Sequence, residues 1–243
     1  MTPDGIPAGA LETRIARARR LLAAVEKNHS PAVFASSFGA EDMVVLDLIA
    51  RDGLAIAIFT LDTGRLPAET HALIADVRKR YGLGITVHSP WPESVDAYVA
   101  EHGIDGFYDG VEQRKACCAI RKVEPLGRAL AGKRAWVTGL RREQSAARSV
   151  LAEAEHDPAR RLWKISPLAE WSEADVWQYL RAHKVPYNAL HDRGYRSIGC
   201  EPCTRAVRPG EDARAGRWWW ESDGARKECG LHEIAVRVEA IHG

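Results

Sequence analysis

The sequence predicts an α/β fold: a doubly wound, mostly parallel β-sheet with helices on both faces and a flexible C-terminal tail. Two observations lead to this prediction. Between residues 31 and 165, short apolar runs alternate with stretches whose apolar residues recur at helical spacing. The 243 residues, 46% of them hydrophobic and 28% charged, are also enough to build one sizeable globular core.

The predicted elements follow one another in a regular cycle. Strands are expected where apolar residues run together, over residues 31–35, 54–59, 84–88, 134–138 and 162–165. Helices are expected where apolar residues return every three or four positions, over residues 11–25, 41–50 and 67–81. Pro67 is suited to a first helical turn. This alternation is typical of a parallel sheet whose crossover helices cover both faces.

The C-terminal third has a different character. Ser172 precedes Asp175 by three positions, a helix-capping pattern, so a helix is expected to begin near Ser172 and to end before Pro186. From residue 187 the chain is rich in Gly, Arg and Trp, shows no clear period before residues 234–241, and is expected to be loosely tethered. We therefore divide the chain into an α/β domain over residues 1–204 and a tail over residues 205–243.

Charge and hydropathy exclude several classes of protein. The 34 basic and 33 acidic residues leave a net charge of +1, so a non-specific binder of nucleic acid is not expected. No apolar run approaches the roughly 18 residues of a membrane span, and the first twenty residues lack the apolar core of a secretory signal. The sequence predicts a cytoplasmic protein without a nucleic-acid or membrane partner.

Three loops follow predicted strands and should meet at one sheet edge, because the carboxyl ends of parallel strands lie together. The first contains Ser36, Ser37, Phe38, Gly39 and Glu41. Its hydroxyls and backbone N–H groups could hold a phosphate, although a plain capping turn explains it equally well. The loop matches neither GxxxxGK[ST] nor GxGxxG, so another mode of nucleotide binding is required.

The second loop contains Leu61, Asp62, Thr63, Gly64 and Arg65. Asp62 and Thr63 could bind a ribose or a base edge, and Arg65 suits a phosphate or sulfate. The alternative is a type I turn stabilised by the aspartate.

The third loop, TGLRREQS, adds Arg141 and Arg142. These arginines could bind an anion, and the alternative is that they are solvated on the surface. Three loops with hydroxyl or arginine content at one edge predict a shared anionic ligand.

The five cysteines form an adjacent pair, Cys117 and Cys118, a CxxC pair, Cys200 and Cys203, and a single late residue, Cys229. Their odd number argues against a disulfide framework, and four paired thiols could hold zinc or an iron–sulfur cluster. Adjacent cysteines cannot form a zinc knuckle, which favours the larger [4Fe–4S] cluster. Zinc and buried or redox-active thiols remain alternatives. Four cations flank the first pair and could offset its negative charge: Arg114, Lys115, Arg121 and Lys122.

Cys229 lies between preceding cations and His232, a setting that favours the thiolate and is compatible with a mobile nucleophile; an ordinary exposed thiol is the alternative. Arg214 and Arg217 could clamp an anion or be surface arginines. The three indoles of residues 218–220 predict that this part of the tail packs against a body or a partner.

In order along the chain, the motifs SSFGAED, LDTGR, CC, TGLRREQS, CEPC, GRWWWE and KECGLH resemble the adenylylsulfate (APS) and phosphoadenylylsulfate (PAPS) reductases, and in particular their cluster-containing, thioredoxin-dependent APS branch. The resemblance covers about residues 33–232. It implies a fold related to the adenine-nucleotide α-hydrolases. The SGGxDS loop of that fold is altered here, since SSFGAED lacks the double glycine and the final serine, and this fits a protein that binds an adenylyl compound without cleaving ATP.

The resemblance also implies the activity: reduction of APS to sulfite and AMP in sulfate assimilation, on the route to cysteine. One [4Fe–4S] cluster would be held by Cys117, Cys118, Cys200 and Cys203, with a structural and electrostatic role. Cys229 would form an S-sulfocysteine that thioredoxin releases. Further site residues implied by the family are Lys122, His232, Arg214 and Arg217, with one of Arg141 and Arg142.

The resemblance further implies a homo-oligomer. The alternatives for function are a PAPS or dual-substrate reductase and a non-catalytic zinc-binding protein.

Overall fold

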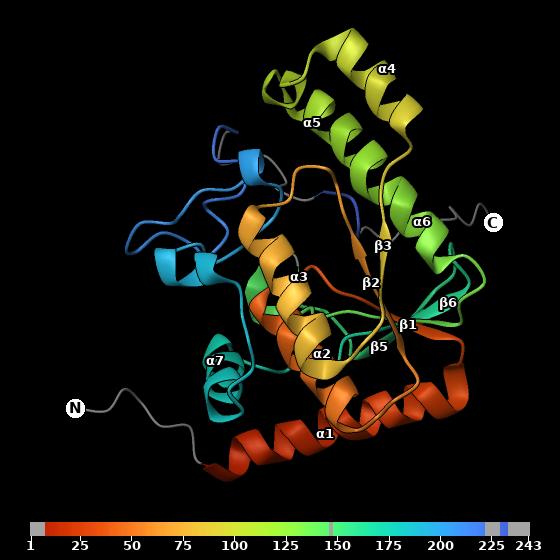
Figure 1. Cartoon of the computed structure of the whole chain (residues 1–243). Helices are drawn as coiled ribbons and strands as arrows, with labels where there is room; N and C mark the ends of the chain where they lie inside the picture. The colour runs from red at the N-terminus through yellow and green to blue at the C-terminus, as the bar shows by residue number, and fades with distance from the viewer. Residues whose placement is uncertain (1–7, 146–147, 222–228, 233–243) are drawn as a thin grey trace, which may run out of the picture.

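A computed structural model describes residues 8–145, 148–221 and 229–232 (Figure 1). In this part of the chain a six-stranded sheet has the order β3-β2-β1-β4-β6-β5. Its strands are β1 (Ala32–Ala35), β2 (Ala57–Leu61), β3 (Ile85–His88), β4 (Ala135–Val137), β5 (Ala154–Asp157) and β6 (Leu162–Ile165). Every pairing is parallel except that of β5 with β6. The predicted mostly parallel α/β fold is confirmed.

Helices cover both faces of this sheet. They are α1 (Ala8–His29), α2 (Ala40–Arg51), α3 (Ala68–Tyr81), α4 (Pro92–His102), α5 (Val111–Cys118), α6 (Glu124–Leu130) and α7 (Glu173–Ala182). Alternate side chains of a strand face opposite sides, so Phe34 of β1 joins the core under α1, α2, α3 and α7, whereas Val33 packs with Trp136 and α6. None of the helices in the described ranges has the length and hydropathy to cross a membrane.

Several element boundaries differ from the sequence prediction. Residues 54–56 do not begin β2, because the Leu54 N–H bonds the Ile49 carbonyl and closes the end of α2. Pro67 is the N-cap of α3, with extended ψ, rather than a residue of its first turn. Helix α7 begins after Ser172 as predicted: the hydroxyl accepts the Asp175 N–H and the aspartate accepts the Ser172 N–H. It ends at Ala182, four residues before Pro186.

The sequence prediction missed β5 and the helices between residues 92 and 130. Strand β5 is an edge strand with the polar sequence AEHD and lacks the apolar run that marks the other strands. Helices α4, α5 and α6 have 11, 8 and 7 residues, too short for a strong helical period.

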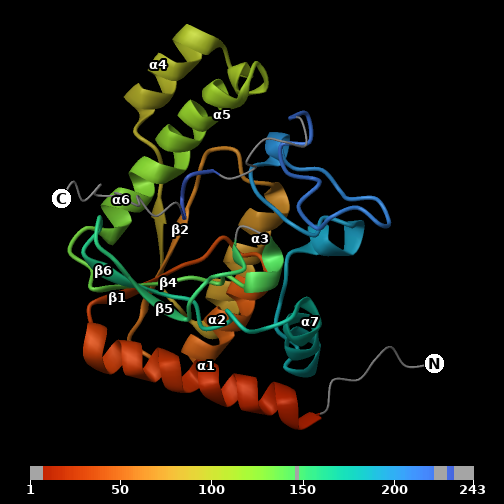
Figure 2. The same cartoon turned by 180° about the vertical axis from the view of Figure 1, so that it is seen from behind.

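The strand order places a topological switch point between β1 and β4. From β1 the chain proceeds outward to β2 and β3, and then returns to the other side of β1 to form β4 and β6. The loops that follow β1 and β4 therefore separate at the carboxyl edge of the sheet and leave a crevice, where folds of this kind bind ligands. Figures 1 and 2 show α5 and the described C-terminal part above this edge.

Helices α5 and α6 are joined by η2 (Ala119–Val123), a π-helical turn that begins directly after Cys118. A π turn inserts an extra residue into the helix and is often found at functional sites. Here it carries Arg121 and Lys122, and both side chains are buried on the side of the cysteines.

The tail is packed as far as residue 221, so the prediction that the chain is loosely tethered from residue 187 is wrong for residues 187–221. Trp218 is 1% exposed, as the three indoles predicted, whereas Trp219 is 49% exposed. Arg114 of α5 bonds Glu221 with an Nε–Oε1 distance of 2.7 Å, and its guanidinium lies 4.5 Å from the Trp218 ring. The helical pattern predicted over residues 234–241 lies outside the described residues.

Loss of the Arg114–Glu221 pair should strongly destabilise the fold. Both side chains are almost fully buried, so Glu221→Ala removes the carboxylate that pairs with a buried guanidinium and should lower the free energy of unfolding by about 3 to 5 kcal/mol. The matched control is Glu112→Ala, which removes the exposed partner of Lys115 and should cost less than about 0.5 kcal/mol. Urea unfolding of both variants beside the wild type measures the difference, and equal midpoints would contradict this account.

Candidate active site

A cavity of about 680 Å³ opens at the carboxyl edge of the sheet. The three predicted loops and the described C-terminal part all contribute to its wall. The site residues predicted from the sequence that line it are Ser36, Ser37, Gly39, Glu41, Leu61, Thr63, Lys122, Arg141, Cys200, Arg214, Arg217, Cys229 and His232. The fold thus brings together residues that lie up to 196 positions apart, from 36 to 232.

Five of the residues predicted to bind the substrate do not line this cavity: Phe38, Asp62, Gly64, Arg65 and Arg142. Phe38 is fully buried in the core, with a φ of 60°. The Asp62 carboxylate accepts the Gly64 N–H at 2.9 Å, which is the aspartate-stabilised turn considered as the alternative. Arg142 donates to the Leu151 carbonyl at 2.7 Å and pairs with Glu170, so its guanidinium is engaged outside the pocket.

Arg65, the fifth, lies beside the cysteines. Its guanidinium donates to the Ile104 carbonyl and lies 4.8 Å from the centre of the Phe107 ring. It lines a small second cavity together with the four paired cysteines.

The hydroxyls of the first loop shape the loop itself. Ser37 donates its N–H and its hydroxyl to Asp42 at 2.6 and 2.7 Å, and the Ser36 hydroxyl accepts the Phe38 N–H. A Cβ at Gly139 would lie 2.2 Å from an Asp42 oxygen. Glycine at this position therefore lets the third loop approach the first.

Burial raises the pKa of Asp42 to about 6, against the hydrogen bonds from Ser37, which favour the ionised form. Because the folded pKa lies above the unfolded value, ionised Asp42 costs stability. The cost grows as pH rises through the interval from about 4 to 6 and is constant above it.

This shift predicts a pH-dependent difference between wild type and Asp42→Asn. The stability of the wild type relative to the variant should fall by about 1 to 1.5 kcal/mol between pH 5 and 7.5. Urea unfolding at several pH values measures it, with Asp76→Asn, at an exposed position of α3, as the control. A difference independent of pH would contradict the assigned shift.

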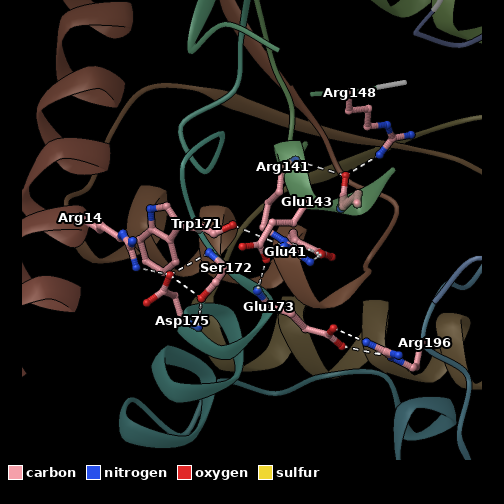
Figure 3. A network of polar contacts seen from close by, with 11 residues as sticks. Arg14, Glu41, Arg141, Glu143, Arg148, Trp171, Ser172, Glu173, Asp175 and Arg196 are labelled. Carbon is pink, nitrogen blue, oxygen red and sulfur yellow. Dashed lines mark hydrogen bonds and ion pairs between the residues drawn. The ribbon is translucent and has the colours of Figure 1, made fainter. Parts of the chain in front are cut away.

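Arg141 joins the first and third loops (Figure 3). Its side chain is nearly buried and bonds Glu41 through Nε and Nη2, at 2.9 and 2.8 Å, and it also reaches the Trp171 carbonyl. Glu143 accepts the N–H of Glu173, the first residue of α7, and Glu173 pairs with Arg196. Of the adjacent Arg141 and Arg142, it is therefore Arg141 that reaches the pocket, where it holds Glu41 in place.

Several other residues line the pocket that were not predicted as site residues, among them Trp136, Arg148, Glu173, Trp177, His191 and Arg196. Trp136 was predicted only as part of a strand. The others belong to no motif, because tertiary packing alone brings α7 and the following turns to the pocket.

The four paired cysteines lie together beside the main pocket. All are buried free thiols; Cys117 and Cys118 end α5, Cys200 is the N-cap of the short helix η6 (Glu201–Cys203), and Cys203 is its last residue. They form one cluster with Trp218 and line one small cavity. Within residues 8–145, 148–221 and 229–232, no three Cys, His, Asp or Glu side chains are arranged around a position for a single metal ion.

The thiols differ in acidity. Burial raises the pKa of Cys203 to about 12 and also raises that of Cys117 and Cys118. Burial acts in the same direction on Cys200, but nearby cations, led by Lys122, and the hydrogen bond with Thr63 at 3.3 Å outweigh it and lower its pKa.

Lys122 connects the two cavities, because it lines both, as Cys200 also does. Burial disfavours its charge, but the charge interactions with the sulfur atoms of Cys200, Cys229 and Cys118 outweigh this effect and raise the pKa of Lys122. A buried ammonium group therefore lies between the paired cysteines and the pocket.

Cys229 is half-buried in the pocket wall and packs against the cluster formed by the four paired cysteines. Cys229, the one cysteine outside the two pairs, therefore faces the space in which a ligand would lie.

The family model described as the phosphoadenosine phosphosulfate reductase domain matches residues 31–206. The chain belongs to this family. The match spans all six strands and both cysteine pairs, whereas Arg214, Arg217, Cys229 and His232 of the pocket lie beyond it.

Curated relatives extend the similarity beyond the matched domain. The chain is 56% identical over 234 residues to the adenosine 5'-phosphosulfate reductase of Allochromatium vinosum, covering 96% of this chain and 91% of the relative. It is 59% identical over 226 residues to the enzyme of the same name from Burkholderia cepacia, covering 93% and 90%.

Solved structures share the fold of this reductase-family chain. The PAPS reductase of Candida auris, in a phosphate complex, superposes with a TM-score of 0.68 at 24% identity, covering 85% of this chain and all of that one. Yeast FAD synthetase superposes with a TM-score of 0.56 at 16% identity, covering 84% and 70%. The predicted relation to the adenine-nucleotide α-hydrolase fold is confirmed.

Proposed function

We propose that this protein reduces APS to sulfite and AMP, in the assimilation of sulfate. The observation that carries the proposal is the position of Cys229 in the wall of a large pocket, beside buried Lys122 and the paired cysteines. The activity named for its relatives supports the same assignment.

In the first step the Cys229 thiolate attacks the sulfur of APS. A bond forms between Sγ and this sulfur, the bond from sulfur to the phosphate oxygen breaks, and AMP leaves with that electron pair. The enzyme then holds an S-sulfocysteine on Cys229. Covalent catalysis of this kind divides a difficult reduction into two substitutions.

In the second step a thiolate of thioredoxin attacks Sγ of Cys229. Sulfite leaves with the electrons of the bond between the two sulfur atoms, and a mixed disulfide remains. The second thiol of thioredoxin then releases Cys229 as its thiolate and becomes part of a thioredoxin disulfide. Thioredoxin supplies the two electrons of the reduction.

The pocket's cations serve the first step. A thiolate that approaches a sulfate is repelled by like charge, so the site has to hold and screen the anion. Lys122, Arg214 and Arg217 line the pocket and are our candidates for this role. Arg141 acts on the loop instead, through Glu41.

The paired cysteines fit a [4Fe–4S] cluster. Four buried thiols line one cavity within an apolar cluster, and Arg65, Arg121 and Lys122 line the same cavity. These cations would offset the negative charge of thiolate ligands. When bound, the cluster would supply structure and electrostatic stabilisation, and Lys122 would couple its charge to the pocket.

The experiment that tests the proposal is sulfite release by anaerobically purified, iron-quantified protein with thioredoxin, run with APS and with PAPS. We expect sulfite and AMP in equal amounts from APS and little turnover of PAPS. A preference for PAPS would support the second candidate of the sequence analysis. Absence of sulfite from both substrates, with iron bound, would overturn the proposed function.

The proposed compartment is the cytoplasm, because free thiols and a thioredoxin partner require reducing conditions. A homo-oligomer remains a prediction, which light scattering of the purified protein would measure.

A further inference from the structure

We propose that Trp136 is a positioning residue, whose indole ring holds the Cys229 segment in the pocket by stacking on His232. The Cys229 segment is defined here as residues 229–232. The first observation is the stack itself: the ring centres of Trp136 and His232 lie 5.2 Å apart and their planes differ by 13°. This is the geometry of an offset-stacked aromatic pair.

Trp136 is a rigid platform. It is the central residue of β4, pairs in register with β1 and β6, and is 1% exposed. Both Trp136 and His232 line the main pocket. The imidazole therefore rests on a part of the sheet that cannot move without disrupting the fold.

The other residues of the segment attach on either side of this stack. Leu231 packs against the same core cluster as Trp136, and Cys229 packs against the paired cysteines. Between them Gly230 has a φ of 81°, a conformation that other residues rarely adopt. The left-handed glycine lets two neighbouring side chains reach two separate clusters.

The two rings are held together by packing, beside the charged side chain of Lys164. Trp136 Nε1 and His232 Nδ1 are both buried, and neither has a hydrogen-bond partner in the described part of the chain. Lys164 Nζ lies 5.6 Å from the centre of the indole ring and pairs with Glu155. Burial, reinforced by Lys164, lowers the pKa of His232 well below its ordinary value, so a neutral imidazole meets the ring.

Because neither of these two ring nitrogens is hydrogen-bonded among the described residues, the stack can separate without breaking a hydrogen bond at either of them. This property suits a cysteine that must first face a substrate inside the pocket and then be reached by a protein reductant. That consequence rests on the proposed function, whereas the docking of the segment on Trp136 does not.

The test is the rate at which iodoacetamide alkylates Cys229 in the anaerobically purified protein, followed by mass spectrometry of the Cys229 peptide. We expect about tenfold faster alkylation in Trp136→Leu and a smaller increase in Trp136→Phe, which keeps an aromatic ring. The matched control is Trp163→Leu on the neighbouring strand β6. Trp163 also contacts two histidines but is 38% exposed, and its replacement should leave the rate unchanged.

His232→Ala provides a second arm that leaves the sheet intact and should also accelerate alkylation about tenfold. An unchanged rate in His232→Ala, or in a folded Trp136→Leu, would overturn the proposal; if Trp136→Leu does not fold, His232→Ala decides. In turnover, His232→Ala and folded Trp136→Leu should lower kcat with little change in the KM for APS. If the variants are alkylated faster but the wild type releases no sulfite, the proposed function alone is overturned. If the wild type releases sulfite but alkylation of the variants is unchanged, the docking alone is overturned.

Discussion

Cys229→Ser should abolish sulfite formation from APS, with a loss of at least about a thousandfold, while the fold and the bound iron are retained. A serine hydroxyl is not ionised near neutral pH and is a poor nucleophile toward sulfur. The remaining four cysteines are buried and are the proposed ligands of the cluster, including Cys200, which also lines the pocket, so none of them is expected to substitute.

Two controls accompany this variant. The affinity for AMP should be close to that of the wild type, because Cys229 is only one of the many side chains that line the pocket. Iron content should also be unchanged. A rate within tenfold of the wild type would exclude Cys229 as the nucleophile and would require another group to receive the sulfur.

Cys203→Ser should remove the iron and the activity together. Cys203 is 7% exposed and shares its cavity with the other three paired cysteines, so no solvent or neighbouring carboxylate among the described residues of this cavity can replace the lost ligand. A serine hydroxyl is a much weaker ligand for iron than a thiolate. Activity should fall because Lys122, which lines both cavities, would no longer face the negative charge of the proposed cluster.

Iron analysis, the brown colour of the protein and sulfite release measure this prediction. The matched variant is Thr204→Ser, a conservative change one position along the chain that keeps the hydroxyl bonded to the Cys200 carbonyl and should retain both iron and activity. Full turnover by an iron-free Cys203→Ser would refute a coupled cluster. A colourless wild-type protein containing zinc would favour the zinc alternative.

Much of the fold follows from local patterns. The run 162–165 becomes β6 over the same residues, and the Ser172 and Asp175 pattern caps α7 as predicted. The placement of three loops at one edge also followed, because strands of a parallel sheet end at the same side. Strand β5 and helices α4 to α6 were missed because a polar edge strand and short helices carry little periodicity.

The loops show where local patterns end. Arg141 and Arg142 are adjacent and chemically alike, yet Arg141 bonds Glu41 in the pocket whereas Arg142 pairs with Glu170 outside it. Arg65 belongs to the second loop, but its side chain lies beside the paired cysteines instead of in the pocket. The direction of each side chain depends on acceptors that come from distant parts of the chain.

By itself, the sequence determined the order of the strands and helices with clear periodicity, the edge at which the loops meet, and the cysteines that distinguish this chain, because periodicity and residue type are local properties. Only the tertiary structure decided that Glu221 pairs with Arg114, that His232 stacks on Trp136 and that Lys122 lies between two cavities. Residues this far apart in sequence carry no shared pattern, and close packing of the folded chain alone selects which of them meet.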